Sequence, residues 1–273
     1  MTADYLPDLP ARSDAERGAE LEARGLGHAY EGRPVLSGID FSVDHGQFAC
    51  IVGPSGVGKT TLLRCLSGLQ RSSEGSVLLG GAEMAGPMPG VAPVFQDYSR
   101  SLMPWASVLH NVTHPLRANR VPPREARDRG RKSLRLVGLD ESTERMYPWQ
   151  LSGGMQQRVA IARAIAYEPT LLLMDEPFAS VDAYTRADLE DLMLRLQREL
   201  GLTVLLVTHD IDEAVYLSDR VIALNGRPAG VVGIVEVPFG RERDQVETKG
   251  LPEFARLRAE VHSLIRGDRG VRA

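Results

Sequence analysis

A short segment near the start of the chain has the composition of a phosphate-binding site. Residues 53–60, GPSGVGKT, place a glycine, a variable stretch and a second glycine before Lys59 and Thr60. Such glycines let backbone N–H groups curl around an anion, and a helix that begins at Lys59 directs its positive end to the same point. Lys59 would then reach the β- and γ-phosphates of a nucleotide, and the Thr60 hydroxyl would bind Mg²⁺.

Three further polar side chains are expected at the ends of buried strands. The apolar run at 171–174 ends in Asp175 and Glu176, and the run at 203–207 is followed closely by His209. Because open α/β sheets bind ligands at the C-terminal ends of their strands, these groups should lie near the phosphate loop. Asp175 could hold Mg²⁺ through water, and Glu176 could orient or deprotonate a hydrolytic water. His209 could equally be structural, and its position at this edge raises the case for function.

A serine and a pair of glycines precede a second amphipathic segment. In LSGGMQQR, residues 151–158, Ser152 is a natural N-cap, and the N–H groups of the helix behind it would form a second anion site. The same pattern is also a common helix cap without a ligand. These residues by themselves leave both readings open.

Flanking patterns predict the elements that position these groups. Residues 47–52 form an apolar run typical of a buried strand, and TTLLRCLSGL after the loop has helical apolar spacing. Strands are also expected over 21–30 and 39–43, with a turn at EGRP, and then at GSVLLGG and VAPVFQ. The chain thus predicts an α/β fold in which a small antiparallel sheet precedes the phosphate-binding strand.

The middle and end of the chain have different sequence patterns. A helical, polar pattern over about 97–166 predicts an inserted helical subdomain, and its basic run at 124–135 is expected to face solvent. A strand hairpin is expected across GRPAG, and a C-terminal helix within 238–273 is expected to pack on the body. The main domain is predicted over 21–237, after a polar lead-in at 1–20 that is expected to be the disordered start of a cytoplasmic protein.

Composition excludes several classes of protein. The chain has 273 residues, 43% of them apolar, and a formal net charge of −4, which allows one large domain or a domain with a subdomain. Without a basic excess, nucleic acid is not expected as a partner. No apolar run approaches the ~20 residues of a membrane span. Cys50 and Cys65 are expected to be buried rather than joined to a metal or to each other.

Taken in order, these motifs resemble those of the ATP-binding cassette (ABC) ATPases, which are P-loop NTPases. The matching elements are Tyr30 like the adenine-stacking aromatic, GPSGVGKTT like Walker A, Gln96 like the Q-loop, LSGGMQQR like the signature, LLLMDE like Walker B, ASVD like the D-loop, and His209 like the switch histidine. The resemblance covers about residues 21–237. The signature separates this family from other P-loop proteins.

The resemblance implies that two subunits meet head to tail with two ATP molecules between them. The residues it assigns to nucleotide binding are Tyr30, Gly53, Pro54, Ser55, Gly56, Val57, Gly58, Lys59, Thr60 and Thr61 of one subunit, and Ser152, Gly153, Gly154 and Asp182 of the other. Glu176 would be the general base, and His209 a γ-phosphate contact. Mg²⁺ would be bound by Thr60, Gln96 and Asp175, and Gln96 would connect this site to the helical insertion.

A narrower resemblance is to ATPase subunits of nitrate, sulfonate, taurine and bicarbonate importers. It rests on VFQ followed by LMPW, on PFASVDAYTR and on PEFARLR. It implies transmembrane permease subunits, an external substrate-binding protein and a peripheral place on the cytoplasmic membrane face. The DYSRS segment after Gln96 and Met155 in the signature depart from the expected pattern, so the substrate stays open, and betaine-type importers and exporters remain alternatives.

Two other kinds of protein are less favoured. A soluble ABC ATPase acting on DNA or ribosomes fits poorly with the short helical insertion, the single cassette and the acidic balance. A catalytically silent ATP-binding scaffold fits poorly with Lys59, Asp175, Glu176 and His209, which are all present.

Overall fold

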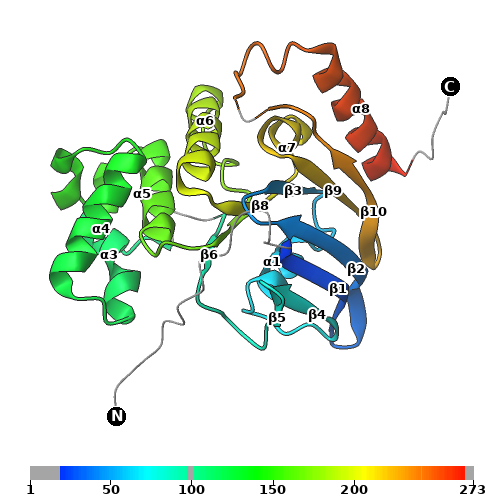
Figure 1. Cartoon of the computed structure of the whole chain (residues 1–273), viewed down its shortest axis with the longest axis horizontal. Coiled ribbons are helices and arrows are strands. Elements are labelled where there is room, and N and C mark those ends of the chain that lie inside the picture. Colours follow the sequence, from blue (N-terminus) through cyan, green and yellow to red (C-terminus); the bar gives the residue numbers. More distant parts are fainter. Residues whose placement is uncertain (1–18, 97–100, 241, 268–273) are drawn as a thin grey trace.

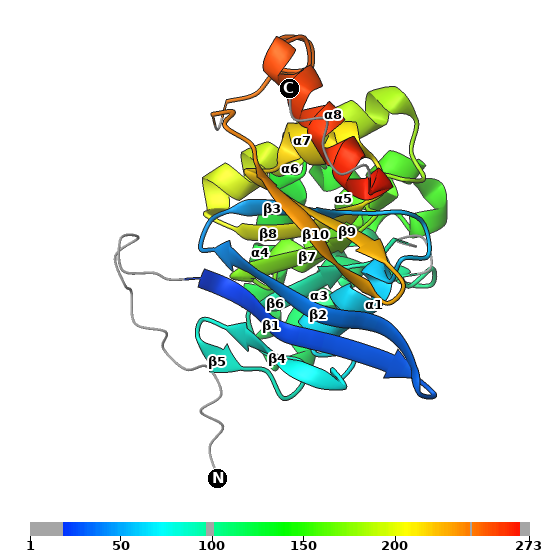
Figure 2. The ribbon, with the colours of Figure 1, turned by 90° about the vertical axis from the view of Figure 1, so that its right-hand side faces the viewer.

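The computed structural model describes residues 19–96, 101–240 and 242–267. Within them the strands form one ten-stranded sheet in the order β5-β4-β1-β2-β10-β9-β3-β8-β7-β6. The strands are β1 (Ala19–Tyr30), β2 (Arg33–Asp44), β3 (Phe48–Val52), β4 (Glu74–Leu79), β5 (Ala82–Glu83), β6 (Val91–Val94), β7 (Leu171–Asp175), β8 (Thr203–Thr208), β9 (Arg220–Gly226) and β10 (Ala229–Glu236). Helices cover this sheet, so the α/β prediction is confirmed (Figures 1 and 2).

The helices are distributed over the whole described chain. They are α1 (Lys59–Leu66), α3 (Val108–Ala118), α4 (Pro123–Leu136), α5 (Gly153–Ile165), α6 (Ala183–Leu200), α7 (Ile211–Leu217) and α8 (Pro252–Arg266), with 3-10 turns η2 (Glu141–Arg145) and η3 (Pro148–Gln150). None of the helices in the described part of the chain is long and apolar enough to cross a membrane.

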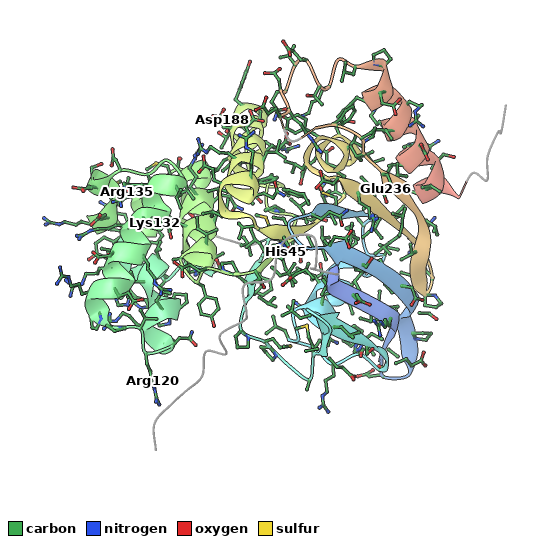
Figure 3. All side chains as sticks on the ribbon, in the orientation of Figure 1. His45, Arg120, Lys132, Arg135, Asp188 and Glu236 are labelled. Carbon is green, nitrogen blue, oxygen red and sulfur yellow. The ribbon has the colours of Figure 1, made fainter. Side chains whose placement is uncertain are left out.

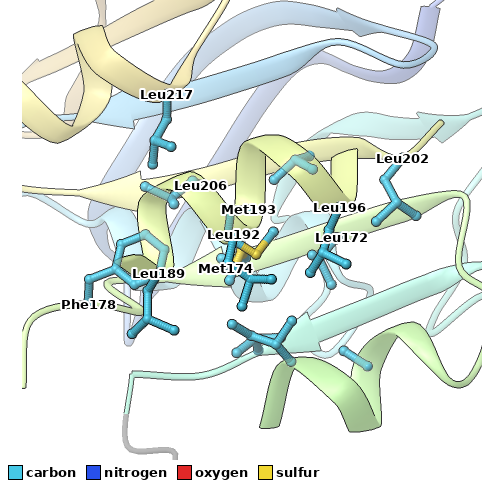
Figure 4. Packing of buried hydrophobic residues seen from close by; sticks show 14 of the residues in the cluster. Leu172, Met174, Phe178, Leu189, Leu192, Met193, Leu196, Leu202, Leu206 and Leu217 are labelled. Carbon is cyan, nitrogen blue, oxygen red and sulfur yellow. The ribbon is translucent and has the colours of Figure 1, made fainter. Parts of the chain in front are cut away.

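Parallel strands form the centre of the sheet and are buried on both faces. β3 pairs in parallel with β8 and β9, and β7 with β8 and β6. Alternate side chains enter opposite cores, as the period of two residues in a strand requires: Cys50 faces the side of α6 and α7, and Ile51 the side of α1. Figure 4 shows the first core, where Leu192 and Leu196 of α6 lie over the sheet. Cys50 and Cys65 are buried and unpaired, as expected.

An antiparallel layer lies on the α1 side (Figure 2). β1 and β2 pair from Ala19↔Asp44 to Tyr30↔Arg33, which is longer than the sequence pattern indicated. β2 begins at Arg33 because backbone pairing continues to the turn, although the side chains there are mostly exposed and do not alternate. β1 begins at Ala19, so residues 19 and 20 belong to a strand and the disordered lead-in was predicted too long by these two residues; residues 1–18 lie outside the described part.

A helical lobe of α3, α4 and α5 lies to one side of the sheet (Figure 1). The helical subdomain was predicted over 97–166, and its first residues, 97–100, lie outside the described part. On α4 the basic side chains are mostly exposed, while Ala126 and Leu134 are buried against the other helices. Figure 3 labels Lys132 and Arg135 on this helix. The basic run therefore forms the solvent-facing side of an amphipathic helix, as its spacing indicated.

The C-terminal helix packs on the body of the molecule. α8 contacts α7, β9 and β10, and its buried side chains are Phe254, Leu257 and Val261. They recur at helical spacing and join the same core as α6 and α7. Residues 268–273, at the end of the predicted tail, lie outside the described part.

Candidate active site

The phosphate loop joins β3 to α1, as its flanking patterns indicated. Gly58 has φ of 113°, in the left-handed region that side chains disfavour. A Cβ on Gly53 would lie 2.6 Å from the carbonyl oxygen of Leu224 at the end of β9. Glycine is therefore required at Gly58 by the backbone conformation and at Gly53 by the close approach of the Leu224 carbonyl.

Lys59 is fixed at the mouth of this loop. Its Nζ donates to the carbonyl oxygens of Gly53 (2.9 Å) and Pro54 (3.2 Å) and lies 3.7 Å from Oε1 of Glu176. Burial lowers the pKa of Lys59, and the negative charges of Glu176 and Asp175 oppose that shift. A buried cation therefore lies beside two carboxylates at the phosphate loop.

Asp175 and Thr60 meet beside this cation. Asp175 ends β7 and is 4% exposed; burial raises its pKa, while a hydrogen bond from Thr60 and the charge of Lys59 oppose the rise. Among the described residues no cluster of three or more His, Cys, Asp or Glu side chains could hold a metal. A hydroxyl beside a carboxylate suits Mg²⁺, which prefers oxygen ligands and keeps waters or phosphate oxygens in its remaining positions.

Glu176 is the point at which the predicted catalytic side chains converge. Its Oε2 lies 3.1 Å from Nδ1 of His209 and accepts a hydrogen bond from Nε2 of Gln96 (3.4 Å). Its φ of 42° is in the left-handed region, and its backbone N–H donates to the carbonyl of Val207 (2.8 Å). A strained backbone held by a neighbouring strand is typical of a functional position.

Tyr30 lies at the rim of the loop, at the end of β1. It is 43% exposed, its hydroxyl donates to Oε1 of Gln70 (3.0 Å), and its ring meets His28 edge to face at 4.7 Å. Hydrogen bonds with Thr61 and Gln70 lower the pKa of Tyr30. The contact with Thr61 ties this aromatic ring to the phosphate loop. His28 and Gln70 belong to no motif that would have identified them.

Ser152 caps α5, on the helical lobe. Its Oγ accepts a hydrogen bond from the N–H of Met155 (3.3 Å), which is the N-cap that the sequence indicated. Gly153 begins the helix, and a Cβ on Gly154 would lie 2.5 Å from Cγ2 of Thr185 on α6. The exposed N-terminus of α5 thus packs beside the N-terminus of α6.

Asp182 caps α6 in the same way. It accepts hydrogen bonds from the backbone N–H (3.0 Å) and hydroxyl (2.7 Å) of Thr185, and the backbone bond is the main reason that its pKa is lowered. Within the described residues, no hydrogen bond or ion pair joins Asp182 or residues 152–154 to the phosphate loop. The structure brings together the residues predicted around Glu176. Asp182 and residues 152–154 do not join that group within one chain.

Two charged residues near the site were not predicted to belong to it. Asp210 directly follows His209, caps α7, and lies 3.3 Å from Nη1 of Arg186 on α6. An acidic residue just before a helical run is an N-cap signal that could have identified Asp210. Arg186 ends the PFASVDAYTR segment, but nothing in that segment indicates its contact with Asp210, because only the tertiary fold brings it to this turn.

Comparison with known proteins identifies the family of this chain. Residues 36–179 match the family model described as ABC transporter. The taurine import ATP-binding protein of Chromobacterium violaceum is 42% identical, over 89% of this chain and 94% of that protein. The nitrate import ATP-binding protein of Synechococcus elongatus is also 42% identical, over 83% of this chain and 82% of its own length.

A solved structure has the same fold. It is a dimeric ATP-binding cassette in a post-hydrolysis state bound to ADP and Pi, 30% identical, with a TM-score of 0.70 over 81% of this chain and all of that one. The matches confirm the family and the fold that the order of the motifs predicted. The chain therefore has the ABC ATPase fold and belongs to the ABC transporter family.

Proposed function

We propose that this chain binds and hydrolyses ATP as a subunit of a bacterial importer for a small anion or an organosulfur compound. The convergence of Lys59, Asp175, Glu176 and His209 at one edge of the sheet is the observation that carries the proposal. Relatives named for taurine and nitrate import support the class of substrate.

ATP would bind along the phosphate loop. Backbone N–H groups and Lys59 would hold the β- and γ-phosphates, and Tyr30 at the rim would stack on the adenine base. Thr60, Asp175 and Gln96 would hold Mg²⁺, which would neutralise phosphate charge. Gln96 already contacts Glu176, so it lies close enough to respond to both the ion and the carboxylate.

Glu176 is the group placed to act on water. Its carboxylate would orient the attacking water and take its proton, while His209 holds Oε2 in place and reaches the γ-phosphate. Because phosphoryl transfer depends mainly on positioning and charge, small shifts of this pair would change the rate strongly.

A second copy of the chain would complete each site. Ser152, Gly153, Gly154 and Asp182 lie apart from the loop of their own chain, and we assign them to the γ-phosphate side of a neighbour's ATP. The dimeric cassette with ADP and Pi supports this assembly. Closure of the dimer would then bring the last charge-stabilising groups into place and start hydrolysis.

The helical lobe is the face we assign to transmembrane permease subunits. Gln96 precedes this lobe in the chain and touches Glu176, so a shift of the lobe would reach the carboxylate directly. The protein would then lie peripherally on the cytoplasmic membrane face, and an external substrate-binding protein would deliver the cargo.

Uptake in cells tests the importer assignment. Deleting the gene should abolish uptake of one of the candidate anions or organosulfur compounds. Wild-type protein should restore it, and Glu176→Gln should not. Glu199→Gln, on an exposed position of α6, is the matched control and should restore uptake. Loss of export, or full rescue by Glu176→Gln, would contradict the proposal.

A further inference from the structure

Asp210 links the start of α6 to the turn that carries His209. Its Oδ1 accepts hydrogen bonds from N–H groups in the first turn of α7, including that of Glu213 (3.2 Å), and so fixes that helix. Its Oδ2 lies 3.3 Å from Nη1 of Arg186, in the first turn of α6. One carboxylate therefore joins the starts of α6 and α7.

A cavity of about 40 Å³ lies at this link, and its lining includes Glu176, His209, Arg186 and Glu213. Glu213 is 4% exposed, and neither its Oε1 nor Nε of Arg186 has a hydrogen-bond partner among the described residues. A buried polar atom without a partner is costly. A cavity of this size has room for a water molecule, and a donor and an acceptor on its lining residues are what such a water needs.

We propose that Arg186 and Glu213 bind a structural water in this cavity and, with Asp210, form a positioning network that fixes His209 relative to the start of α6 at Asp182. The inference rests on the proposed function, because His209 and Asp182 matter here as nucleotide-site residues. Arg186 and Glu213 touch no reacting atom, so they are positioning residues. The network would carry a shift at Asp182, caused by dimer closure, to the γ-phosphate contact.

The protonation of Glu213 sets the charge of this network. Burial, together with the charges of Glu190 and Asp210, raises the pKa of Glu213 to about 8. The groups that act on this carboxyl are Glu190 and Arg186 of α6, Thr208, Asp210 and Cys50 of β3. Glu176 and His209 line the same cavity, and Lys249 pairs with Glu190 at 3.1 Å. A neutral carboxyl both donates and accepts a hydrogen bond, whereas its ionised form would place a second negative charge beside Asp210.

Steady-state kinetics of the purified full-length chain test the role of Arg186. Arg186→Met keeps the length of the side chain and loses both the ion pair and the donor, so kcat should fall about tenfold. The KM for ATP should change less than about twofold, because the phosphate loop is untouched. Arg186→Lys keeps a charge for Asp210 and should recover part of kcat. Arg198→Met, exposed on the same helix, is the control and should behave as wild type.

The pH profile tests the role of Glu213. Wild-type kcat should fall between about pH 7 and about pH 9 as this carboxyl ionises. Glu213→Gln cannot ionise, so its kcat should fall less between these pH values. Its kcat at pH 9 divided by its kcat at pH 7 should exceed the same quotient for wild type by about threefold. A purely structural role would lower the melting temperature without changing the shape of this profile.

The outcomes separate this inference from the proposed function. The positioning network would be overturned if Arg186→Met had the same kcat as wild type. It would also be overturned if the pH dependence of kcat in Glu213→Gln coincided with that of wild type. A wild-type protein that binds ATP without hydrolysing it would instead overturn the proposed function, and this assay comes first.

Discussion

Glu176 unites a strained backbone with contacts to His209, Gln96 and Lys59. Glu176→Gln keeps the shape of the side chain and removes the base, so ATP should still bind while kcat falls about 10² to 10⁴-fold. Nucleotide binding and phosphate release by the purified protein measure the two effects. Near-normal turnover would remove the catalytic role assigned to Glu176.

Glu213 gives stability an unusual dependence on pH. Its pKa rises from 4.5 in the unfolded chain to about 8 in the folded one, so the folded state binds more protons between these values. The free energy of unfolding therefore falls as pH rises through this window. Relative to wild type, Glu213→Gln should gain about 2 to 5 kcal/mol between pH 5 and pH 8.

Urea denaturation at the two pH values measures this gain. Glu199→Gln, at an exposed position, should show no such trend and serves as the control. A stability difference between Glu213→Gln and wild type that stays constant with pH would mean that Glu213 is ionised throughout.

At the scale of elements, α5 and α6 depend on close approach at Gly154. A Cβ there would lie 2.5 Å from Cγ2 of Thr185, so Gly154→Ala should separate the helix starts and cost about 1 to 3 kcal/mol. Thr185→Ser removes that methyl group and keeps the hydroxyl that Asp182 accepts from. The double variant should recover most of the loss in thermal unfolding, and purely additive losses would exclude this contact as the cause.

The packing of α8 makes a second prediction at this scale. Leu257 is 1% exposed in the core shared with α7, so Leu257→Ala should lower the free energy of unfolding by about 2 to 5 kcal/mol. Glu260→Ala removes only an exposed ion pair with Arg256 and should change it by less than about 1 kcal/mol. Equal effects in denaturant titrations would show that α8 is not part of the cooperative fold.

At the scale of the whole molecule, the site is expected to be shared between two copies. Lys59→Met and Ser152→Arg should each abolish hydrolysis, because each head-to-tail site needs both residues. In an equal mixture, half of the dimers are mixed and carry one intact site. Hydrolysis should therefore return to at most about a quarter of the wild-type rate. A mixture no more active than its components would argue against the composite site.

Local sequence determined the elements and most of their chemistry. The phosphate loop, the two carboxylates after β7 and the cap at Ser152 are encoded within a few residues, because strand runs, glycines and cap residues act locally. Strand ends were less predictable. β2 extends to Arg33 because β1 offers backbone partners there, which no side-chain pattern reports.

Only the tertiary structure decided which distant groups meet. His209 could be placed at the right edge from its strand, but its contact with Glu176 at 3.1 Å depends on two parallel strands lying side by side. Arg186 of α6 meets Asp210 and Glu213 at the start of α7 around one cavity, and no spacing along the chain encodes that meeting. The sequence by itself predicted a phosphate-binding loop. The packing of α6 and α7 decided which charges surround His209, because burial and proximity exist only in the folded chain.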